Sequence, residues 1–193
     1  MFLKLFKYLL LILLMTCHSC SDTPEYYNFL GDSLVTRWDL QQSFPDLLTK
    51  NYGLSGSGIE HIKAYAGKFD RQILVVLSGT NDLQANFTTD NVEKYADDFI
   101  KAVIATESDR IYIISVLPCR FNGNSERERN RVIVEFNDAV RERAANGRIR
   151  FIDVHDMFLK DGEMNMQYSY DGLHLNPYGY EILNHQLNKY LQK

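Results

Sequence analysis

Short runs of consecutive apolar residues recur along the chain and are separated by longer stretches of mixed polarity. Ile73–Leu77 and Ile111–Leu117 are the clearest runs, and Gly79 and Pro118 follow them. Aliphatic and β-branched runs of this length predict strands that are buried on both faces of a sheet. Three further segments are predicted to be strands: Tyr26–Leu30, Asn51–Tyr52 and Ile149–Val154. Apolar and polar residues alternate most in the last of these, which is therefore expected nearest an edge of the sheet.

The stretches between these runs carry apolar residues at spacings of three and four, which is the period of an amphipathic helix. The pattern predicts helices over residues 90–106, 126–145 and 177–191, and Pro177 suits the first turn of the last one. Strands that alternate with helices form a parallel sheet covered on both faces. We therefore expect an α/β fold, a three-layer α/β/α sandwich with a five-stranded parallel sheet, whose site lies beyond the carboxyl ends of the strands.

The first residues have the pattern of an export signal. Lys4 and Lys7 precede the apolar run Tyr8–Met15, which is shorter than the roughly 20 residues of a membrane-spanning helix. The next residues resemble a bacterial lipoprotein cleavage site, where cleavage before Cys20 leaves a lipid on that cysteine. Ordinary signal-peptidase cleavage, a lipid on Cys17 instead, and a redox pair of the two cysteines are the alternatives. The expected organisation is a signal peptide over residues 1–19, a linker over 20–25 and one folded domain over 26–193.

Composition and charge narrow the function classes. The chain of 193 residues is 45% hydrophobic and 24% charged, which is ordinary for one globular domain. Its formal net charge is −4, and Arg127, Arg129 and Arg131 alternate with glutamates as on a solvated helix face. Nucleic-acid binding is not expected, because it needs a clustered basic surface. Cys119 is the only cysteine of the expected domain over residues 26–193, which predicts a small buried residue and no internal disulfide.

Two glycine-containing motifs follow the first two predicted strands. In Gly31-Asp32-Ser33, a serine at a strand-to-helix turn can present its hydroxyl at the sheet edge; the alternative role is a helix cap. In the segment 53–58, the backbone N–H of Gly56 can donate to an oxyanion. The alternative is a flexible turn, which is the role expected of Gly53 and Gly58. The Gly-x-Gly-x-x-Gly spacing of a dinucleotide-binding loop is absent, and the segment lacks the Lys of a P-loop.

Two further motifs supply an amide and a base. Asn81 follows the strongest predicted strand and can aim its side-chain amide at the same oxyanion, with an Asx-type turn as the alternative. Asp171 and His174 stand three residues apart, so one loop can hold both. Asp171 can orient the His174 ring and stabilise its cation while the ring takes a proton from Ser33. No group of His, Cys, Asp and Glu residues has metal-site spacing, so neither a metal nor a cofactor is expected.

Together and in this order, the four motifs resemble the blocks of the SGNH hydrolase superfamily, also called GDSL esterases. The resemblance runs from about Asn28 to the C-terminus and implies a flavodoxin-like SGNH hydrolase domain over residues 26–193. A lesser departure is Ser57, where many relatives have Asp. The resemblance implies two sets of site residues: a catalytic triad of Ser33, Asp171 and His174, and an oxyanion hole of Ser33, Gly56 and Asn81.

The expected activity is therefore serine ester hydrolysis of small O-acyl esters, above all acetyl esters, with carbohydrate as the expected alcohol. Short joins between the motifs leave little chain to cover a long acyl group. A lysophospholipase or thioesterase of the same family, a non-catalytic binding protein and a flavodoxin-like nucleotide binder are the alternatives. The expected location is the bacterial envelope, with membrane contact through a lipid on Cys20, or otherwise the periplasm or the exterior. The oligomeric state is left open.

Large side chains beside the motifs are candidates for lining a substrate pocket. Trp38 and Tyr168 are the ones expected to stack on a sugar ring. The whole group consists of Trp38, Phe121, Met164, Met166, Tyr168 and Tyr170. Half of these six residues are expected to pack in the core instead.

Overall fold

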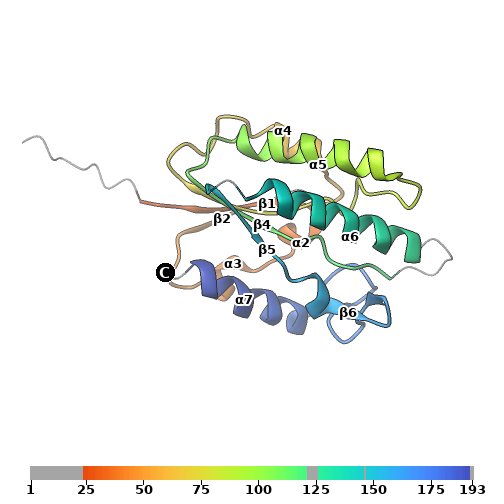
Figure 1. Ribbon diagram of the computed structural model, residues 1–193. Helices are drawn as coiled ribbons and strands as arrows, with labels where there is room; N and C mark the ends of the chain where they lie inside the picture. The colour runs from red at the N-terminus through yellow and green to blue at the C-terminus, as the bar shows by residue number, and fades with distance from the viewer. Residues whose placement is uncertain (1–23, 121–125, 146, 192–193) are drawn as a thin grey trace, which may run out of the picture.

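The structure, a computed structural model, describes residues 24–120, 126–145 and 147–191 and has three layers (Figure 1). The central sheet has five parallel strands in the order β2-β1-β3-β4-β5, so the predicted sandwich with a five-stranded parallel sheet is confirmed. From β1 the chain first builds outward to β2 and then returns to β3 on the other side. Ligands of such folds bind at this reversal. The strand bounds are β1 Tyr27–Gly31, β2 Thr49–Gly53, β3 Ile73–Leu77, β4 Arg110–Ile114 and β5 Ile149–Ile152.

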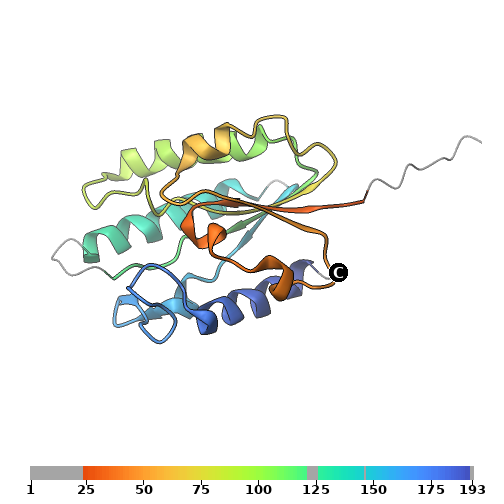
Figure 2. The same ribbon diagram turned by 180° about the vertical axis from the view of Figure 1, so that it is seen from behind.

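Helices cover both faces of the sheet, as Figures 1 and 2 show from opposite sides. Alternate residues of β3 explain why its sequence is apolar throughout. Leu74 and Val76 pack with the helices of one face, whereas Ile73, Val75 and Leu77 pack with those of the other, and none is more than 1% exposed. The first face carries α4 Ile59–Lys63, α5 Thr89–Ile104 and α6 Glu126–Arg143, and the second carries α2 Ser33–Thr36, α3 Leu40–Ser43 and α7 Pro177–Leu191.

The chain after β5 forms a short 3₁₀ helix, η1 His155–Phe158, and a hairpin of β6 Leu159–Lys160 with β7 Glu163–Met164. Asp161 and Gly162 join the two strands with φ angles of 54° and 83°. A two-residue type I′ turn needs positive φ at both positions, which Asp and Gly tolerate. The sequence pattern predicts neither this hairpin nor α3 and α4, because none of these elements is long enough to show a period.

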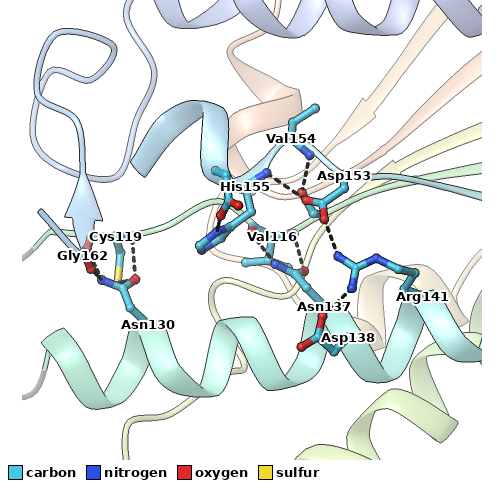
Figure 3. A network of polar contacts seen from close by, with 12 residues as sticks. Val116, Cys119, Asn130, Asn137, Asp138, Arg141, Asp153, Val154, His155 and Gly162 are labelled. Atoms are coloured by element: carbon cyan, nitrogen blue, oxygen red, sulfur yellow. Dashed lines mark hydrogen bonds and ion pairs between the residues drawn. The ribbon is translucent and has the colours of Figure 1, made fainter. Parts of the chain in front are cut away.

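Two buried asparagines of α6 hold the segment that follows β4 (Figure 3). Asn137 accepts a hydrogen bond from the N–H of Val116 at 2.8 Å and donates one to the carbonyl of the same residue at 2.9 Å. Asn130 makes the same pair with Cys119, at 2.8 Å in both directions. These side chains satisfy backbone groups at a place where the sheet has ended. Cys119 itself is fully buried, as its sequence context predicts.

Candidate active site

Ser33 is the first residue of α2, directly after β1, and is 8% exposed. Asp32 caps this helix, because its Oδ1 accepts the N–H of Leu34 at 2.9 Å. The alternative role of Ser33 as the cap is therefore wrong, and its hydroxyl is available to another partner. That partner is His174, whose Nε2 lies 3.0 Å from Ser33 Oγ.

Asp171 uses both carboxylate oxygens to fix the position of His174. Its Oδ2 lies 2.7 Å from Nδ1 of the His174 ring. Its Oδ1 accepts the backbone N–H groups of Leu173 and His174, at 3.0 and 2.7 Å. The hydroxyl of Ser169 donates to the His174 carbonyl at 2.8 Å and closes the loop. The structure thus brings the three predicted residues into one continuous chain of contacts, from Asp171 through His174 to Ser33.

Gly172 allows this loop to form. Its φ angle is +86°, and an ideal Cβ at this position would lie 1.9 Å from the carbonyl oxygen of Arg120. The N–H of Arg120 donates to the Gly172 carbonyl at 2.8 Å, so the loop docks against the segment after β4. A side chain at Gly172 would force the loop away and would move Asp171 and His174 with it.

Two carboxyl groups close to His174 have opposite electrostatic environments. Partial burial alone would raise the pKa of Asp171, but hydrogen bonds from the ring and backbone of His174 and from the N–H of Leu173 together lower it to about 2. Burial raises the pKa of Asp32 to about 6, although the N–H of Leu34 and the charge of His174 oppose the rise. Asp171 is therefore ionised across the physiological range and is suited to stabilise an imidazolium.

Gly56 and Asn81 lie in the loops that follow β2 and β3. Gly56 has a φ angle of +76°, and Asn81 Nδ2 donates to the carbonyl of Ser57 at 2.8 Å. Asn81 therefore joins the two loops and does not cap a turn of its own. A carboxamide has two N–H groups, so one stays available. In the part of the chain that the structure describes, no acceptor engages the backbone N–H of Gly56 or of Ser33.

Asp82 is a residue of the site region that the sequence analysis misses. Its Oδ2 accepts the N–H of Ile59 at 2.7 Å and the hydroxyl of Tyr95 at 2.5 Å. An ideal Cβ on Gly58 would lie 2.0 Å from this carboxylate, so Gly58 is a point of close approach and not simply a flexible turn. Gly53 is another, because its ideal Cβ would lie 2.2 Å from the N atom of Thr36. The only sequence signal for Asp82 is its place next to Asn81.

The arginines of α6 also differ in part from the predicted solvated face. Arg131 forms ion pairs with Glu128 and Glu135, as that prediction requires. Arg129 instead donates to the backbone carbonyl of Thr80, one residue before Asn81. The third motif is therefore held both by Arg129 from α6 and, through Asp82, by Tyr95 from α5.

The aromatic residues that are candidates for stacking on a sugar differ in how far the structure buries them. Trp38 is 3% exposed and packs against the rings of Phe29, Phe44 and Tyr180, so it cannot offer a face to a sugar. Tyr168 is half-buried, with its ring edge-on to that of Phe158. Tyr170, 68% exposed, is the ring that faces outward beside the triad.

Two expectations concern metal binding and the membrane. Among the described residues there is no group of three or more His, Cys, Asp or Glu side chains that could hold a metal ion. No helix within residues 24–120, 126–145 and 147–191 is long and apolar enough to cross a membrane. The expected signal peptide, with Cys17 and Cys20, lies outside the described residues, as does Phe121.

Comparison with known families decides the class of this protein. Residues 29–182 match the GDSL-like lipase/acylhydrolase family, over a span that includes all four motifs. The chain belongs to the GDSL-like lipase/acylhydrolase family. This GDSL hydrolase is therefore an enzyme of the class that acts on ester bonds, and the predicted resemblance is confirmed.

Solved structures of this family share the fold. A Streptococcus pneumoniae protein named for platelet activating factor is 26% identical, with 90% of this chain and 86% of that one covered and a TM-score of 0.69. A GDSL-like lipase from Bacteroides thetaiotaomicron is 18% identical, with 87% of this chain and 88% of that one covered and a TM-score of 0.69. A catalytic mutant of an acetylxylan esterase from Geobacillus stearothermophilus is 20% identical, with 86% of this chain and 93% of that one covered and a TM-score of 0.65.

A curated relative has a different name. The N-acylneuraminate cytidylyltransferase of Escherichia coli is 28% identical over an alignment of 179 positions, and the alignment covers 86% of this chain. The GDSL hydrolase spans only 40% of the length of that relative.

Proposed function

We propose that this GDSL hydrolase cleaves small O-acyl esters, chiefly acetyl esters of carbohydrates, through an acyl-enzyme on Ser33. The observation that carries the proposal is the chain of contacts at 3.0 Å from Ser33 Oγ to His174 Nε2 and 2.7 Å from His174 Nδ1 to Asp171. This is the arrangement of a nucleophile, a base and the group that orients the base.

In the first half of the reaction, His174 Nε2 takes the proton of the Ser33 hydroxyl as Oγ attacks the ester carbonyl. Asp171 stays ionised, keeps the remaining ring proton on Nδ1 and stabilises the imidazolium. The tetrahedral intermediate collapses when His174 returns the proton to the leaving alcohol, which leaves an ester on Ser33. Water, activated by the same ring, then releases the acid and restores the serine.

The oxyanion of the intermediate needs donors that are fixed before the reaction begins. The backbone N–H groups of Ser33 and Gly56 and the second N–H of Asn81 are the donors that we assign to it. They come from the ends of three neighbouring strands. The links from Asn81 to Ser57 and from Asp82 to Ile59 support this assignment, because they hold the second and third motifs against each other.

Two comparisons support a short acyl group on a sugar. The neighbour from Geobacillus stearothermophilus is an acetylxylan esterase, which supports both the acetyl group and the sugar, and the name of the curated relative refers to a sugar, N-acylneuraminate, which supports the sugar alone. Only Asp32 stands between β1 and α2, and only residues 54–58 stand between β2 and α4. These joins leave little chain to cover a long acyl group, which would therefore gain little of the roughly 0.8 kcal/mol that each buried CH₂ contributes. A non-catalytic binding protein would not need a complete triad.

The test is kcat/KM for p-nitrophenyl esters from acetyl to decanoyl, followed by acetate release from xylose tetraacetate and from O-acetylated N-acetylneuraminate. We expect the highest value for acetyl and a decline with each added pair of carbons. A steady rise toward decanoyl would contradict the short-acyl assignment and would favour the lysophospholipase alternative. Absence of turnover with every ester would contradict the catalytic role altogether.

We also propose that the enzyme is exported and held at the bacterial envelope by a lipid on Cys20. The leader pattern of Lys4, Lys7 and Tyr8–Met15 supports export. Firm attachment needs more than one acyl chain, as in a bacterial lipoprotein. Cys20→Ser should move the protein from the membrane to the soluble fraction or block its processing, and Cys17→Ser should not. A Cys20→Ser protein that is processed normally and stays in the membrane fraction would refute the anchor.

A further inference from the structure

A cavity of about 460 Å³ lies on the second face of the molecule, between the α2–α3 segment and the start of α7. Figure 2 shows α3, in orange, beside α7, in blue. Its lining does not include Ser33, Asp171 or His174 but does include residues that follow or precede them in the chain. Arg37 comes four residues after Ser33, and Tyr170 directly precedes Asp171. The volume lies in the range of cavities that bind small molecules.

Hydrogen bonds between the two segments build the wall of this cavity. The indole N–H of Trp38 donates to Asn184 Oδ1 at 2.9 Å, and Asn184 Nδ2 donates to Ser43 Oγ at 3.0 Å. The hydroxyl of Tyr180 donates to the Leu34 carbonyl at 2.8 Å and so ties α7 to the helix that carries the nucleophile. The cavity is therefore formed before any ligand arrives.

Other side chains that line the cavity have hydrogen-bond donors or acceptors without a partner among the described residues. Within the described residues, no hydrogen bond or ion pair engages the guanidinium of Arg37, the carboxylate of Glu181 or the side-chain amide of Gln42. Asp39 uses one carboxylate oxygen to cap α3 and keeps the other. The ring of Tyr170 is 68% exposed and adds an apolar surface next to these groups.

The chemistry of the free groups selects the kind of ligand. A guanidinium only donates hydrogen bonds, a carboxylate only accepts them, and an amide does both. One cation and two carboxylates give the lining a net negative charge, which disfavours an anionic ligand. An acyl chain would leave the same polar groups unpaired, which costs free energy. A neutral molecule with several hydroxyl groups satisfies donors and acceptors alike.

We propose that this cavity binds the sugar part of the substrate, a neutral polyhydroxylated ring, while the acyl group lies at Ser33. Arg37 and Glu181 pair with sugar hydroxyls, and the Tyr170 ring covers an apolar face of the sugar. The proposal rests on the ester hydrolysis proposed above, because it places the alcohol half of the same ester.

Binding can be measured without turnover, because Trp38 is the only tryptophan of the chain and lies in the cavity wall. Xylobiose is titrated into the full-length protein while the Trp38 fluorescence is followed. We expect a saturable change with a Kd of the order of millimolar. Arg37→Ala and Tyr170→Ala should each raise that Kd at least about tenfold. The matched controls are Arg148→Ala, at the opposite end of the sheet, and Tyr178→Ala, 65% exposed and outside the lining; both should keep the wild-type Kd.

A kinetic ratio separates this proposal from the proposed function. The ratio is kcat/KM for xylose tetraacetate divided by kcat/KM for p-nitrophenyl acetate, which carries no sugar. It should fall at least about tenfold in Arg37→Ala and Tyr170→Ala and stay at the wild-type value in both controls. A wild-type ratio in all four variants, or no saturable fluorescence change, would overturn the sugar subsite while leaving ester hydrolysis intact. A wild-type protein that hydrolyses no ester but binds xylobiose through Arg37 would instead overturn the proposed function alone.

Discussion

Replacing Asp171 with asparagine changes the group behind His174 while keeping its shape. In the native structure, Oδ1 accepts the N–H groups of Leu173 and His174, and Oδ2 lies 2.7 Å from His174 Nδ1. Asparagine can keep its oxygen on those two backbone donors only by turning its NH₂ group toward Nδ1. Two donors would then face each other, so the neutral ring moves its proton to Nε2. The ring thereby loses the lone pair that takes the proton of Ser33.

The expected loss is large because the base is removed while the nucleophile and oxyanion donors stay in place. The equivalent change in a serine protease lowers kcat by roughly 10⁴, or about 5.4 kcal/mol, and we expect a similar loss in Asp171→Asn. The assay is kcat and KM for p-nitrophenyl acetate, with the effect confined mainly to kcat. Asp161→Asn, at the exposed β6–β7 turn, is the matched control and should retain the wild-type rate. A folded Asp171→Asn enzyme within about tenfold of the wild-type rate would refute this account of the triad.

Three further predictions follow from contacts around the triad. Asn81→Ala should lower kcat by roughly 10²–10³, or about 2.7–4 kcal/mol, with little change in KM, and an unchanged rate would limit Asn81 to its bond with Ser57. Tyr95→Phe leaves the half-buried Asp82 carboxylate with one partner fewer and should lower the free energy of unfolding in urea by about 1–3 kcal/mol; the exposed Tyr178→Phe is the control, and equal losses in the two variants would count against the link. The pKa of Asp32 is raised to about 6 in the folded state, so the native protein binds more protons than the unfolded chain and this carboxyl loses stabilising effect as pH rises from about 4 through 6. The melting temperature of Asp32→Asn minus that of the wild type should therefore be higher at pH 7 than at pH 4. The same difference at both pH values would disprove the raised pKa of Asp32.

The sequence predicts the parts of the fold that have a clear period. Ile73–Leu77 is apolar at every position because both of its faces are buried, and the strand has the predicted bounds. The amphipathic pattern of residues 90–106 likewise predicts α5 to within two residues at each end. The β6–β7 hairpin escapes prediction because each strand has two residues, and only the Asp161-Gly162 turn leaves a signal.

The candidate site is predicted in its members but not in its supports. Ser33, Asp171 and His174 follow from spacing, since one tight loop brings Asp171 against His174 and a strand end presents Ser33. The partnership of Asp82 with Tyr95 depends on how α5 packs against the third motif, which no local pattern encodes. The burial of Trp38 could not be foreseen for the same reason, because Tyr180 of α7 covers it.

The central claim is that Ser33 carries the acyl group, and covalent labelling tests it most directly. The protein is treated with diisopropyl fluorophosphate, and its peptides are mapped by mass spectrometry while the remaining p-nitrophenyl acetate activity is measured. The account predicts one adduct, on Ser33, whose occupancy matches the fraction of activity lost. Loss of activity with the adduct on another residue, or full labelling of Ser33 with activity retained, would contradict it.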